Sequence, residues 1–563
     1  MDWIPSAFRW LFDSKPDSKL NVEQGARGRL IPRWIFLRAL GCIYFSAFFS
    51  LVFQIRGLIG PEGILPAGEY LQAVEHTVGH ARGLWYAPTL LWLASGPHTL
   101  TTLCWVGMGA SLLLVLNLWP RGMLAVCFLC FLSFVSAAQD FSGYQSDGML
   151  LEAGFIALFF SPPGLRPGWG AASPPSRASL FLLLWEWFRI YFESGVAKII
   201  GGDPEWRNFT AMDEYYQNGP LPTWIGWYMQ HLPHWFHAST VFATLALELV
   251  LVWMFILPRR WRIACFFIVT PWQVVVILTA NYTFLNYLVL MLGFLLLDDR
   301  FLLQFCPPRF RELWRRSLVA TASSEASLPL TDRTLQASAE PAQSAQSETR
   351  DWRGAFPRTF RILKLSLSGI MLSWIFYATT VELIWMFSVA LPLPTEPVEA
   401  LEPFRIANRY GLFGIMTRGR YEIEFQGSED GKTWVPYPFR YKPQDLNTPP
   451  GIYAPYQPRF DWNLWFASLG SWRDYPIGPN TEVRLLSNDK DVLALFAKNP
   501  FPQRPPREVR AVIWQYWFTT ISEKRTQGVW WRRQLMGLYA PTLEREPDGT
   551  IRGVEWPTVG VRE

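Results

Sequence analysis

Residues 34–55 read WIFLRALGCIYFSAFFSLVFQI, and Arg38 is the only charged residue among them. A helix needs about 20 predominantly apolar residues to cross a bilayer, and this segment has that length. The sequence therefore predicts a polytopic α-helical membrane bundle of about nine transmembrane helices, of which 147–161 is the shortest. The other apolar runs lie near 99–119, 122–140, 147–161, 179–200, 239–257, 261–280, 282–298 and 362–391.

The composition agrees with a membrane protein that also has a hydrophilic part. Half of the 563 residues are hydrophobic and only 17% are charged, against about 25% in an average soluble domain. Mean hydropathy is only +0.10, because charged residues are scarce in the first half and plentiful after about residue 400. A net charge of +5 is too small at this length to indicate a nucleic-acid partner.

Positive charge indicates which ends of the helices face the cytoplasm, because cationic loops stay inside. Arginines precede the first apolar run, and the clusters at 259–262 and 309–316 fall on the same side when the chain is threaded back and forth. Residues 317–350 are rich in Ser, Ala and Gln, which is typical of a disordered loop. The predicted organisation is a cytoplasmic segment over 1–32, a transmembrane helical domain over 33–300, a basic and disordered cytoplasmic linker over 301–360, a last transmembrane helix over 361–392 and a non-cytoplasmic β-rich domain over 393–563.

The hydrophilic C-terminal part shows the patterns of strands and turns. Residues 421–425 (YEIEF) alternate apolar and polar side chains, which is typical of a half-buried strand. Residues 427–431 (GSEDG) form a turn, and 434–441 and 509–518 are further strand candidates. We expect a β-rich, sandwich-like soluble domain.

Charged side chains inside the apolar runs are costly and need partners. Glu186, Arg189 and Glu193 fall on one face of the predicted helix over 179–200 and are expected to form an internal ion-pair set. Lys198 lies away from that face. It either extends to the interface or serves as a desolvated base. The expected intramembrane polar network comprises Asp140, Gln145, Asp147, Glu152, Glu186, Arg189 and Glu248.

Two further patterns suggest metal or redox sites and have simpler interpretations. His231, His234 and His237 are spaced by three, but Pro233 interrupts the helix and aromatic residues surround the histidines. An interfacial amphipathic helix is the favoured interpretation. The Cys127–Cys130 spacing lies within an apolar run, where ordinary core cysteines are expected. We expect neither a metal site nor a cofactor.

Longer stretches carry a resemblance to a known family. They begin at residues 57 (GLIGPEGILPAGEYL), 141 (FSGYQSDGMLLEAGF), 193 (ESGVAKIIGGDPEW), 281 (NYTFLNYL), 408 (NRYGLFGIMTRGRYEIEF), 454 (APYQPRFDWNLWF), 499 (NPFPQRPPREVRA) and 530 (WWRRQLMGLYAP). These stretches resemble the lipase maturation factor family over both the membrane part and the outer domain. The resemblance marks as motif residues of the outer domain Asn408, Arg409, Tyr410, Gly411, Arg459, Asp461 and Trp462. Ser146 departs from the pattern, because the resemblance predicts a bulky aromatic residue before the aspartate.

The resemblance implies a membrane protein that assists the folding and maturation of exported or lumenal proteins, which in the animal family are lipases. The expected partners are membrane lipids and exported client proteins such as lipases. Short loops, and a chain that ends without a retention tetrapeptide, favour a bacterial inner membrane; in a eukaryote the endoplasmic reticulum membrane is expected.

One helix supports an alternative. Residues 191–198 (YFESGVAK), followed by Trp206, resemble the membrane motif of vitamin K-dependent γ-carboxylases. In that family a lysine at the position matching Lys198 serves as a base on the quinol cofactor. The alternative is an intramembrane enzyme acting on a lipid or quinone-like substrate, with Lys198, Glu193 and Asp203 as catalytic residues.

Overall fold

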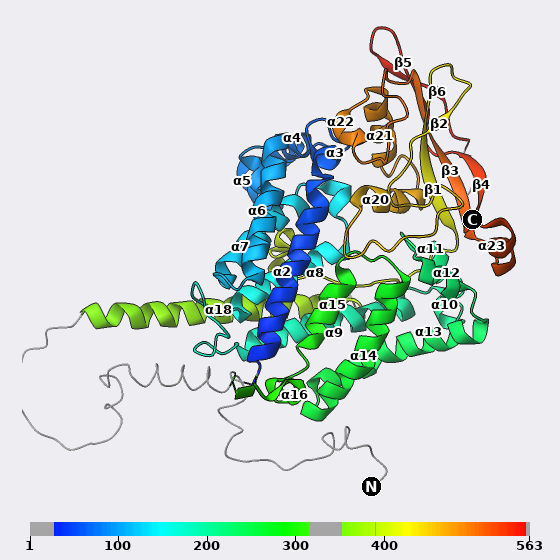
Figure 1. Cartoon of the computed structure of the whole chain (residues 1–563). Helices are drawn as coiled ribbons and strands as arrows, with labels where there is room; N and C mark the ends of the chain where they lie inside the picture. The colour runs from blue at the N-terminus through cyan, green and yellow to red at the C-terminus, as the bar shows by residue number, and fades with distance from the viewer. Residues whose placement is uncertain (1–27, 310, 313, 315–351, 389, 559–563) are drawn as a thin grey trace, which may run out of the picture.

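The computed structural model describes residues 28–309, 311–312, 314, 352–388 and 390–558. The predicted N-terminal segment up to residue 27 and the predicted disordered loop over 317–350 lie outside the described residues. A helical domain occupies one end of the molecule and a domain containing a β-sheet occupies the other end (Figure 1).

A helix is present at each of the apolar runs. Helices α2, α6, α7 and α8 pack against one another in sequence order, and α15 packs on α2 and α9. The helices at the runs are α2 (Leu30–Val52), α6 (Pro97–Val115), α7 (Pro120–Val135), α8 (Gln145–Phe160), α9 (Arg177–Ile200), α13 (His234–Leu249), α14 (Arg259–Thr279), α15 (Leu285–Phe294) and α18 (Trp352–Trp385). Shorter helices connect them: α3 (Ile55–Ile59), α4 (Ala67–Val78), α5 (His80–Tyr86), α10 (Pro204–Arg207), α11 (Tyr215–Asn218), α12 (Trp224–Gln230), α16 (Asp299–Phe305) and α19 (Glu396–Glu399).

Among the described residues, five helices are long and apolar enough to cross a membrane. They cover Leu30–Val52, Pro97–Val115, His234–Ile256, Arg259–Thr279 and Leu363–Trp385. Helices α7 and α8 have 16 residues each, or about 24 Å, which is short of a hydrocarbon core of about 30 Å. Helix α9 is long enough but carries four charged side chains between Glu186 and Lys198. The membrane bundle is therefore confirmed, while the number of about nine crossings stays a prediction.

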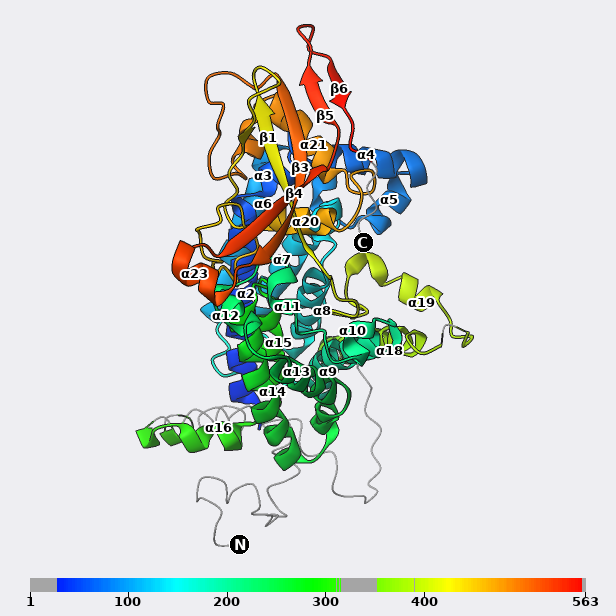
Figure 2. The ribbon, with the colours of Figure 1, turned by 90° about the vertical axis from the view of Figure 1, so that its right-hand side faces the viewer.

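Helix α18 does not follow the direction of α2. It runs crosswise to α2 in Figure 1, and Figure 2 views it close to end-on. The two helices therefore cannot both follow the membrane normal. The assignment of 361–392 as a last transmembrane helix stays a prediction for this reason.

The C-terminal domain contains one antiparallel sheet in the order β2-β1-β3-β5-β6, with β4 paired to β3. Strand β1 pairs with β3 along its whole length, from Arg420 opposite Tyr516 to Ser428 opposite Glu508. The strands predicted at 421–425 and 509–518 are confirmed, whereas only Val435–Pro436 of the candidate at 434–441 forms a strand. The strands are β1 (Arg420–Ser428), β2 (Val435–Pro436), β3 (Glu508–Phe518), β4 (Trp531–Leu538), β5 (Thr542–Arg545) and β6 (Ile551–Glu555).

The expectation of a sandwich is wrong, because helices form the second layer. Helix α20 (Arg459–Ser468) packs on β1 and α21 (Ile477–Leu486) packs on β3, while α22 (Lys490–Leu493) and α23 (Ile521–Gln527) lie outside this layer. Apolar and acidic side chains alternate along β1, and this alternation explains why helices cover one face of the sheet and ion pairs the other. Ile423 and Phe425 are fully buried in the apolar core. On the other face, Glu422 pairs with Lys442 at 2.7 Å and Glu424 with Arg533 at 3.2 Å. A face lined with carboxylates is covered by ion pairs rather than by a second sheet.

Candidate functional site

Residues 408–417, here called the junction segment, connect the helical domain to β1 and have no regular secondary structure. Side chains of the helical domain accept hydrogen bonds from their backbone. The N–H of Asn408 donates to Glu152 Oε2 at 3.0 Å, and that of Tyr410 donates to Glu193 Oε2 at 2.6 Å. Backbone donors that lack a helix or strand partner need such acceptors when they are buried. The junction segment is thus held by carboxylates on α8 and α9.

Three more side chains of the helical domain accept hydrogen bonds from backbone N–H groups later in the junction segment. Gly411 N–H donates to Gln145 Oε1 at 3.1 Å, Leu412 N–H to Ser194 Oγ at 3.2 Å and Met416 N–H to Asp203 Oδ2 at 2.6 Å. Gln145 belonged to the expected polar network and Asp203 to the expected catalytic residues. Both serve to hold the junction segment.

Arg189 lies at the centre of this network. It pairs with Glu152, lies 3.7 Å from Glu193 and donates to the carbonyl oxygen of Asn408 at 2.6 Å. The Tyr410 ring packs against its guanidinium, and the Tyr410 hydroxyl donates to Glu152 Oε2 at 2.9 Å. Two buried carboxylates thus balance the charge of the buried cation, and one of them and a carbonyl oxygen accept hydrogen bonds from it.

The expected ion-pair set of Glu186, Arg189 and Glu193 is wrong in one member. Arg189 pairs with Glu152 of the neighbouring helix α8 in place of Glu186. Glu186 is fully buried, and within the described residues neither of its carboxylate oxygens has a hydrogen-bond partner. The periodicity of α9 carries no information about which residues of a neighbouring helix will pack against Arg189.

A second contact joins the domains through Arg459 of α20. Its guanidinium forms a bidentate pair with Asp147 of α8 at 2.7 and 2.8 Å, and both side chains are fully buried. Arg459 also donates to the Phe141 carbonyl oxygen at 2.7 Å, and one helical turn on, Asn463 donates to the backbone oxygen of Asp140 at 2.8 Å. Such a planar, bidentate pair fixes the orientation of α20 on the helical domain.

The remaining motif residues of the outer domain have different surroundings. The Trp462 ring packs on Tyr144 with ring centroids 5.0 Å apart. Asp461 faces the outer domain, where it accepts the backbone N–H groups of Tyr441 and Lys442 at 3.2 and 3.1 Å. Burial raises the pKa of Asp461 to about 6.

Lys198 also serves the junction. Its ammonium lies 2.9 Å from Glu248 and donates to the carbonyl oxygens of Leu412 at 3.0 Å and Ser194 at 3.4 Å. These partners use all three ammonium protons. Glu248 thus finds its partner in Lys198 rather than in the other members of the expected network. Since Glu193 and Asp203 accept backbone N–H groups of the same segment, the structure does not support the enzyme alternative.

The three histidines are not gathered around one point. The His231 ring lies between the carbonyl oxygens of Trp227 and Thr519, at 2.7 and 2.9 Å, whereas His234 contacts Asp213 at 2.9 Å. Within the described residues no group of three His, Cys, Asp or Glu side chains is placed to hold a metal ion. His231 instead connects α12 to the loop that precedes α23.

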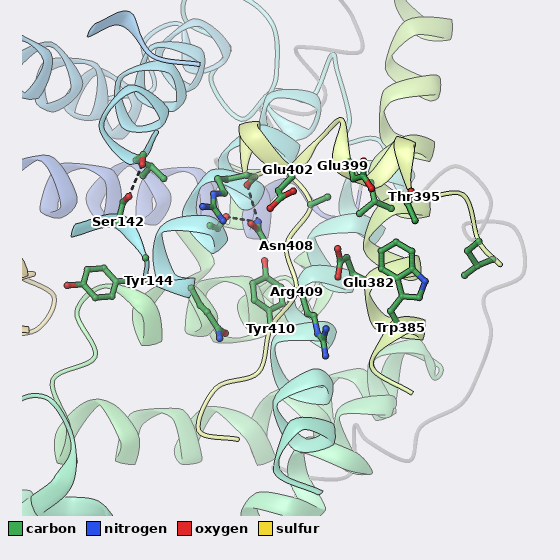
Figure 3. A pocket seen from close by; sticks show the side chains of 18 of the residues that line it. Ser142, Tyr144, Glu382, Trp385, Thr395, Glu399, Glu402, Asn408, Arg409 and Tyr410 are labelled. Carbon is green, nitrogen blue, oxygen red and sulfur yellow. Dashed lines mark hydrogen bonds between the residues drawn. The ribbon is translucent and has the colours of Figure 1, made fainter. Parts of the chain in front are cut away.

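Two cavities flank the junction segment. The first, here called the acidic cavity, has a volume of about 630 Å³ and lies between α18 and the junction segment (Figure 3). Glu382, Glu399 and Glu402 line it, and so does Trp385, the last residue of α18. The second, here called the apolar cavity, has a volume of about 640 Å³ and lies between the junction segment and α20. Arg409 lines both cavities.

Comparison with known proteins follows the same two-domain division. Residues 31–304 match the family model of the lipase maturation factor transmembrane domain, and residues 406–541 match that of the lipase maturation factor C-terminal domain. Human lipase maturation factor 2 is 33% identical, with 92% of this chain and 83% of the relative covered. The chain belongs to the lipase maturation factor family.

Both named types of lipase maturation factor are among its relatives. Bovine lipase maturation factor 1 is 31% identical, with 94% of this chain and 91% of the relative covered. Chicken lipase maturation factor 2 is 32% identical, with 93% and 82% covered. No solved structure matches the chain. The second family model begins at residue 406, two residues before the junction segment.

Some of the residues singled out in the membrane part contact residues singled out in the outer domain: Asp147 pairs with Arg459, and Glu152 accepts hydrogen bonds from Asn408 and Tyr410. Sequence reasoning did not join them, and it missed Ser194, Asn463 and Arg420. The Arg420 guanidinium is fully buried and donates to the carbonyl oxygens of Gln217 at 2.9 Å and Pro220 at 3.0 Å. One signal was available: basic side chains in an otherwise strand-like, half-buried segment require partners.

Proposed function

We propose that this protein is a membrane-bound maturation factor, which assists the folding of exported proteins from the non-cytoplasmic face of the membrane. The names of its relatives point to lipases as clients. The observation that carries the proposal is the buried contact between the domains. Arg459 and the junction segment hold the C-terminal domain on α8 and α9, so the domain is presented at a fixed position beside the membrane, where an exported chain emerges.

The distribution of basic residues supports the non-cytoplasmic placement without depending on a count of crossings. Arg29 and Arg33 at the start of α2, and Arg259 at the start of α14, lie at the end of the molecule where α16 is found. Arg259 pairs there with Asp298, at 2.5 and 3.0 Å. The C-terminal domain lies at the opposite end (Figures 1 and 2). Because basic ends stay in the cytoplasm, the C-terminal domain belongs outside or in the lumen.

Membrane lipids are the proposed neighbours of the helical domain. Large apolar side chains point outward from the candidate spans, among them Phe242 on α13 and Phe267 on α14, which are 65% and 51% exposed. Such surfaces need an apolar environment. The bacterial inner membrane is the proposed location, and in a eukaryotic cell the location would be the endoplasmic reticulum membrane.

Co-expression with a secreted lipase tests the function. The measured quantity is lipase activity per mass of lipase exported, with and without the full chain. We expect the chain to raise this specific activity, and a variant that lacks 393–563 but remains in the membrane to give no increase. Equal specific activity with and without the full chain would refute the proposal.

A further inference from the structure

Two groups of large apolar side chains point outward at the end of the bundle that lies away from its basic residues, here called the outer end. The first, here called the α5 patch, consists of Leu84, Tyr86, Leu90 and Leu93. The second, here called the α12 patch, consists of Trp224, Tyr228, Leu232 and Trp235. All eight side chains are exposed, and the most exposed of each patch, Leu93 and Trp235, reach 87% and 70%. Apolar surface of this extent marks a site of contact with another apolar body.

The α5 patch lies at the outer end of α6. It directly precedes the first residue of this helix, Pro97. A Cβ at Gly41, early in α2, would meet Val115 at the end of α6, and a Cβ at Gly107 of α6 would meet Phe48, late in α2. Helix α6 therefore runs antiparallel to α2. Since the basic residues stand at the start of α2, α6 begins at the outer end.

The α12 patch lies at the outer end of α14. The Thr223 hydroxyl, at the N-cap of α12, donates to the carbonyl oxygen of Leu278 at 2.9 Å, and α14 ends at Thr279. Helix α14 begins at Arg259 and has 21 residues, or about 31 Å, which matches a hydrocarbon core of about 30 Å. When α14 crosses the bilayer from its basic end, α12 therefore lies at the outer boundary of the hydrocarbon.

The surface below the α12 patch has the character of a lipid-facing surface. Trp235 and Phe242 are seven positions apart on α13, so they share one face of this helix. Along α14, Phe267 and Val274 are exposed, and Trp261 is exposed near the basic end. Exposed aromatic side chains at both ends of an apolar span are typical of the two membrane interfaces.

Helix α12 joins this boundary to the C-terminal domain. Trp224 and Tyr228 are four positions apart and share the exposed face of the helix. Trp227 is buried, and its ring packs on Trp530 of the C-terminal domain with ring centroids 5.3 Å apart. The inward face of α12 thus holds the C-terminal domain, while the outward face is free to enter an apolar environment.

The placement of the two patches selects the partner. They lie on opposite sides of the bundle in both views (Figures 1 and 2). A bilayer surrounds the bundle and reaches both sides at once, whereas one protein partner covers one side. Trp and Tyr among large aliphatic side chains favour the boundary between lipid headgroups and acyl chains.

We infer that the α5 and α12 patches insert into the outer leaflet at this boundary, and that the α12 patch thereby fixes the C-terminal domain against the membrane surface. The partner is the lipid bilayer itself. The inference concerns lipid contact and does not depend on which proteins the chain matures, so the lipase assay and the experiment below can fail separately.

Spin-label accessibility tests the inference. The full chain, with its natural cysteines replaced, carries one nitroxide-labelled cysteine and is placed in phosphatidylcholine nanodiscs. The measured quantity is the ratio of the collision rate with oxygen, which enters the bilayer, to that with a nickel chelate, which stays in water. We expect Leu93→Cys and Trp235→Cys to give ratios several-fold above those of residues in water and below that of Phe267→Cys in the middle of α14.

Two exposed polar residues on neighbouring helices provide matched controls. Gln72→Cys on α4 and Thr526→Cys on α23 should give the low ratio of a label in water. A ratio at 93 and 235 equal to these controls would place the patches in water. Exclusion of both reagents would show that protein covers the patches, and a ratio equal to that at 267 would place them inside the hydrocarbon core. Each of these results would overturn the inference.

Photocrosslinking in the chain with its natural cysteines carries the test if the replaced chain does not fold. p-Benzoylphenylalanine at position 93 or 235 should form adducts with radiolabelled phosphatidylcholine, as at position 267, whereas position 72 should form none. These positions are exposed, so the substitution leaves the core intact. A crosslinked dimer, or lipid adducts at 267 without adducts at 93 and 235, would contradict insertion of the patches.

Discussion

The pair formed by Arg459 and Asp147 is predicted to control docking of the C-terminal domain. Arg459→Met removes one partner of a fully buried bidentate pair and leaves the Asp147 carboxylate without its cation. Breaking such a pair costs about 3–5 kcal/mol. The variant also loses the hydrogen bond to the Phe141 carbonyl oxygen. We therefore expect the free energy of undocking to fall by at least about 3 kcal/mol.

Native-state proteolysis of the connection over 390–407 measures undocking, because the protease cleaves only the transiently opened form. A loss of about 3 kcal/mol corresponds to cleavage roughly a hundredfold faster. The double variant Asp147→Leu/Arg459→Met replaces both charges with apolar groups and should restore most of the protection. Asp147→Asn alone should behave like Arg459→Met.

A surface pair between the same two domains provides the matched control. Arg484 of α21 pairs with Glu62 at 2.9 Å, and the Glu62 side chain is 70% exposed. Arg484→Met should change undocking by less than about 1 kcal/mol. The reasoning is refuted if Arg459→Met accelerates cleavage no more than Arg484→Met, or if the double variant is as sensitive as the two single variants combined.

Further predictions concern individual residues. Because the pKa of Asp461 is raised to about 6, the folded state binds a proton between about pH 4 and pH 6 that the unfolded state does not. The contribution of Asp461 to stability is therefore highest below about pH 4 and is lost as the pH rises through 6, by about 3 kcal/mol. Asp461→Asn keeps the acceptor oxygen, so its thermal midpoint should fall less than that of the wild type between pH 4.5 and pH 7; equal slopes would contradict this. Lys198→Met should lower the thermal midpoint, while Lys198→Met/Glu248→Leu should recover both stability and lipase maturation. A folded double variant that matures no lipase would instead restore the case for a reactive Lys198. A Cβ at Gly148 would lie 2.7 Å from Asn408 Oδ1, so Gly148→Ala should displace the junction segment and speed its proteolysis about tenfold, whereas Gly109→Ala, where a Cβ meets nothing within 4 Å, should not.

The sequence determined the positions of helices and strands more fully than their surroundings. Apolar length located a helix at each of the nine runs, and alternation located β1 and β3. Alternation states that one face of a strand is apolar, but it does not state what covers either face. The carboxylates of Glu422 and Glu424 are satisfied by Lys442 and Arg533, and no local pattern indicates that pairing. This is why a sandwich was expected where helices and ion pairs cover the sheet.

For the candidate site, the sequence predicted which buried charged residues need partners, but it did not predict the partners. The cost of buried charge identified Asp147, Glu152 and Arg189 as residues that need partners. Their partners Arg459 and Tyr410 lie more than 200 positions away in the sequence and on a different domain, and periodicity within one helix cannot reveal such contacts. The resemblance named residues on both sides of the junction, but only the fold brings the two groups together.

Cysteine accessibility tests most directly the claim that the C-terminal domain stands on the non-cytoplasmic face. In a chain whose natural cysteines are replaced, Ser522→Cys places an exposed thiol on α23, and Arg300→Cys places one on α16 at the basic end. An impermeant maleimide is added to intact spheroplasts, and again after permeabilisation. The account predicts that position 522 is labelled in intact spheroplasts and that position 300 is labelled only after permeabilisation. The reverse pattern would place the C-terminal domain in the cytoplasm and contradict the proposed function.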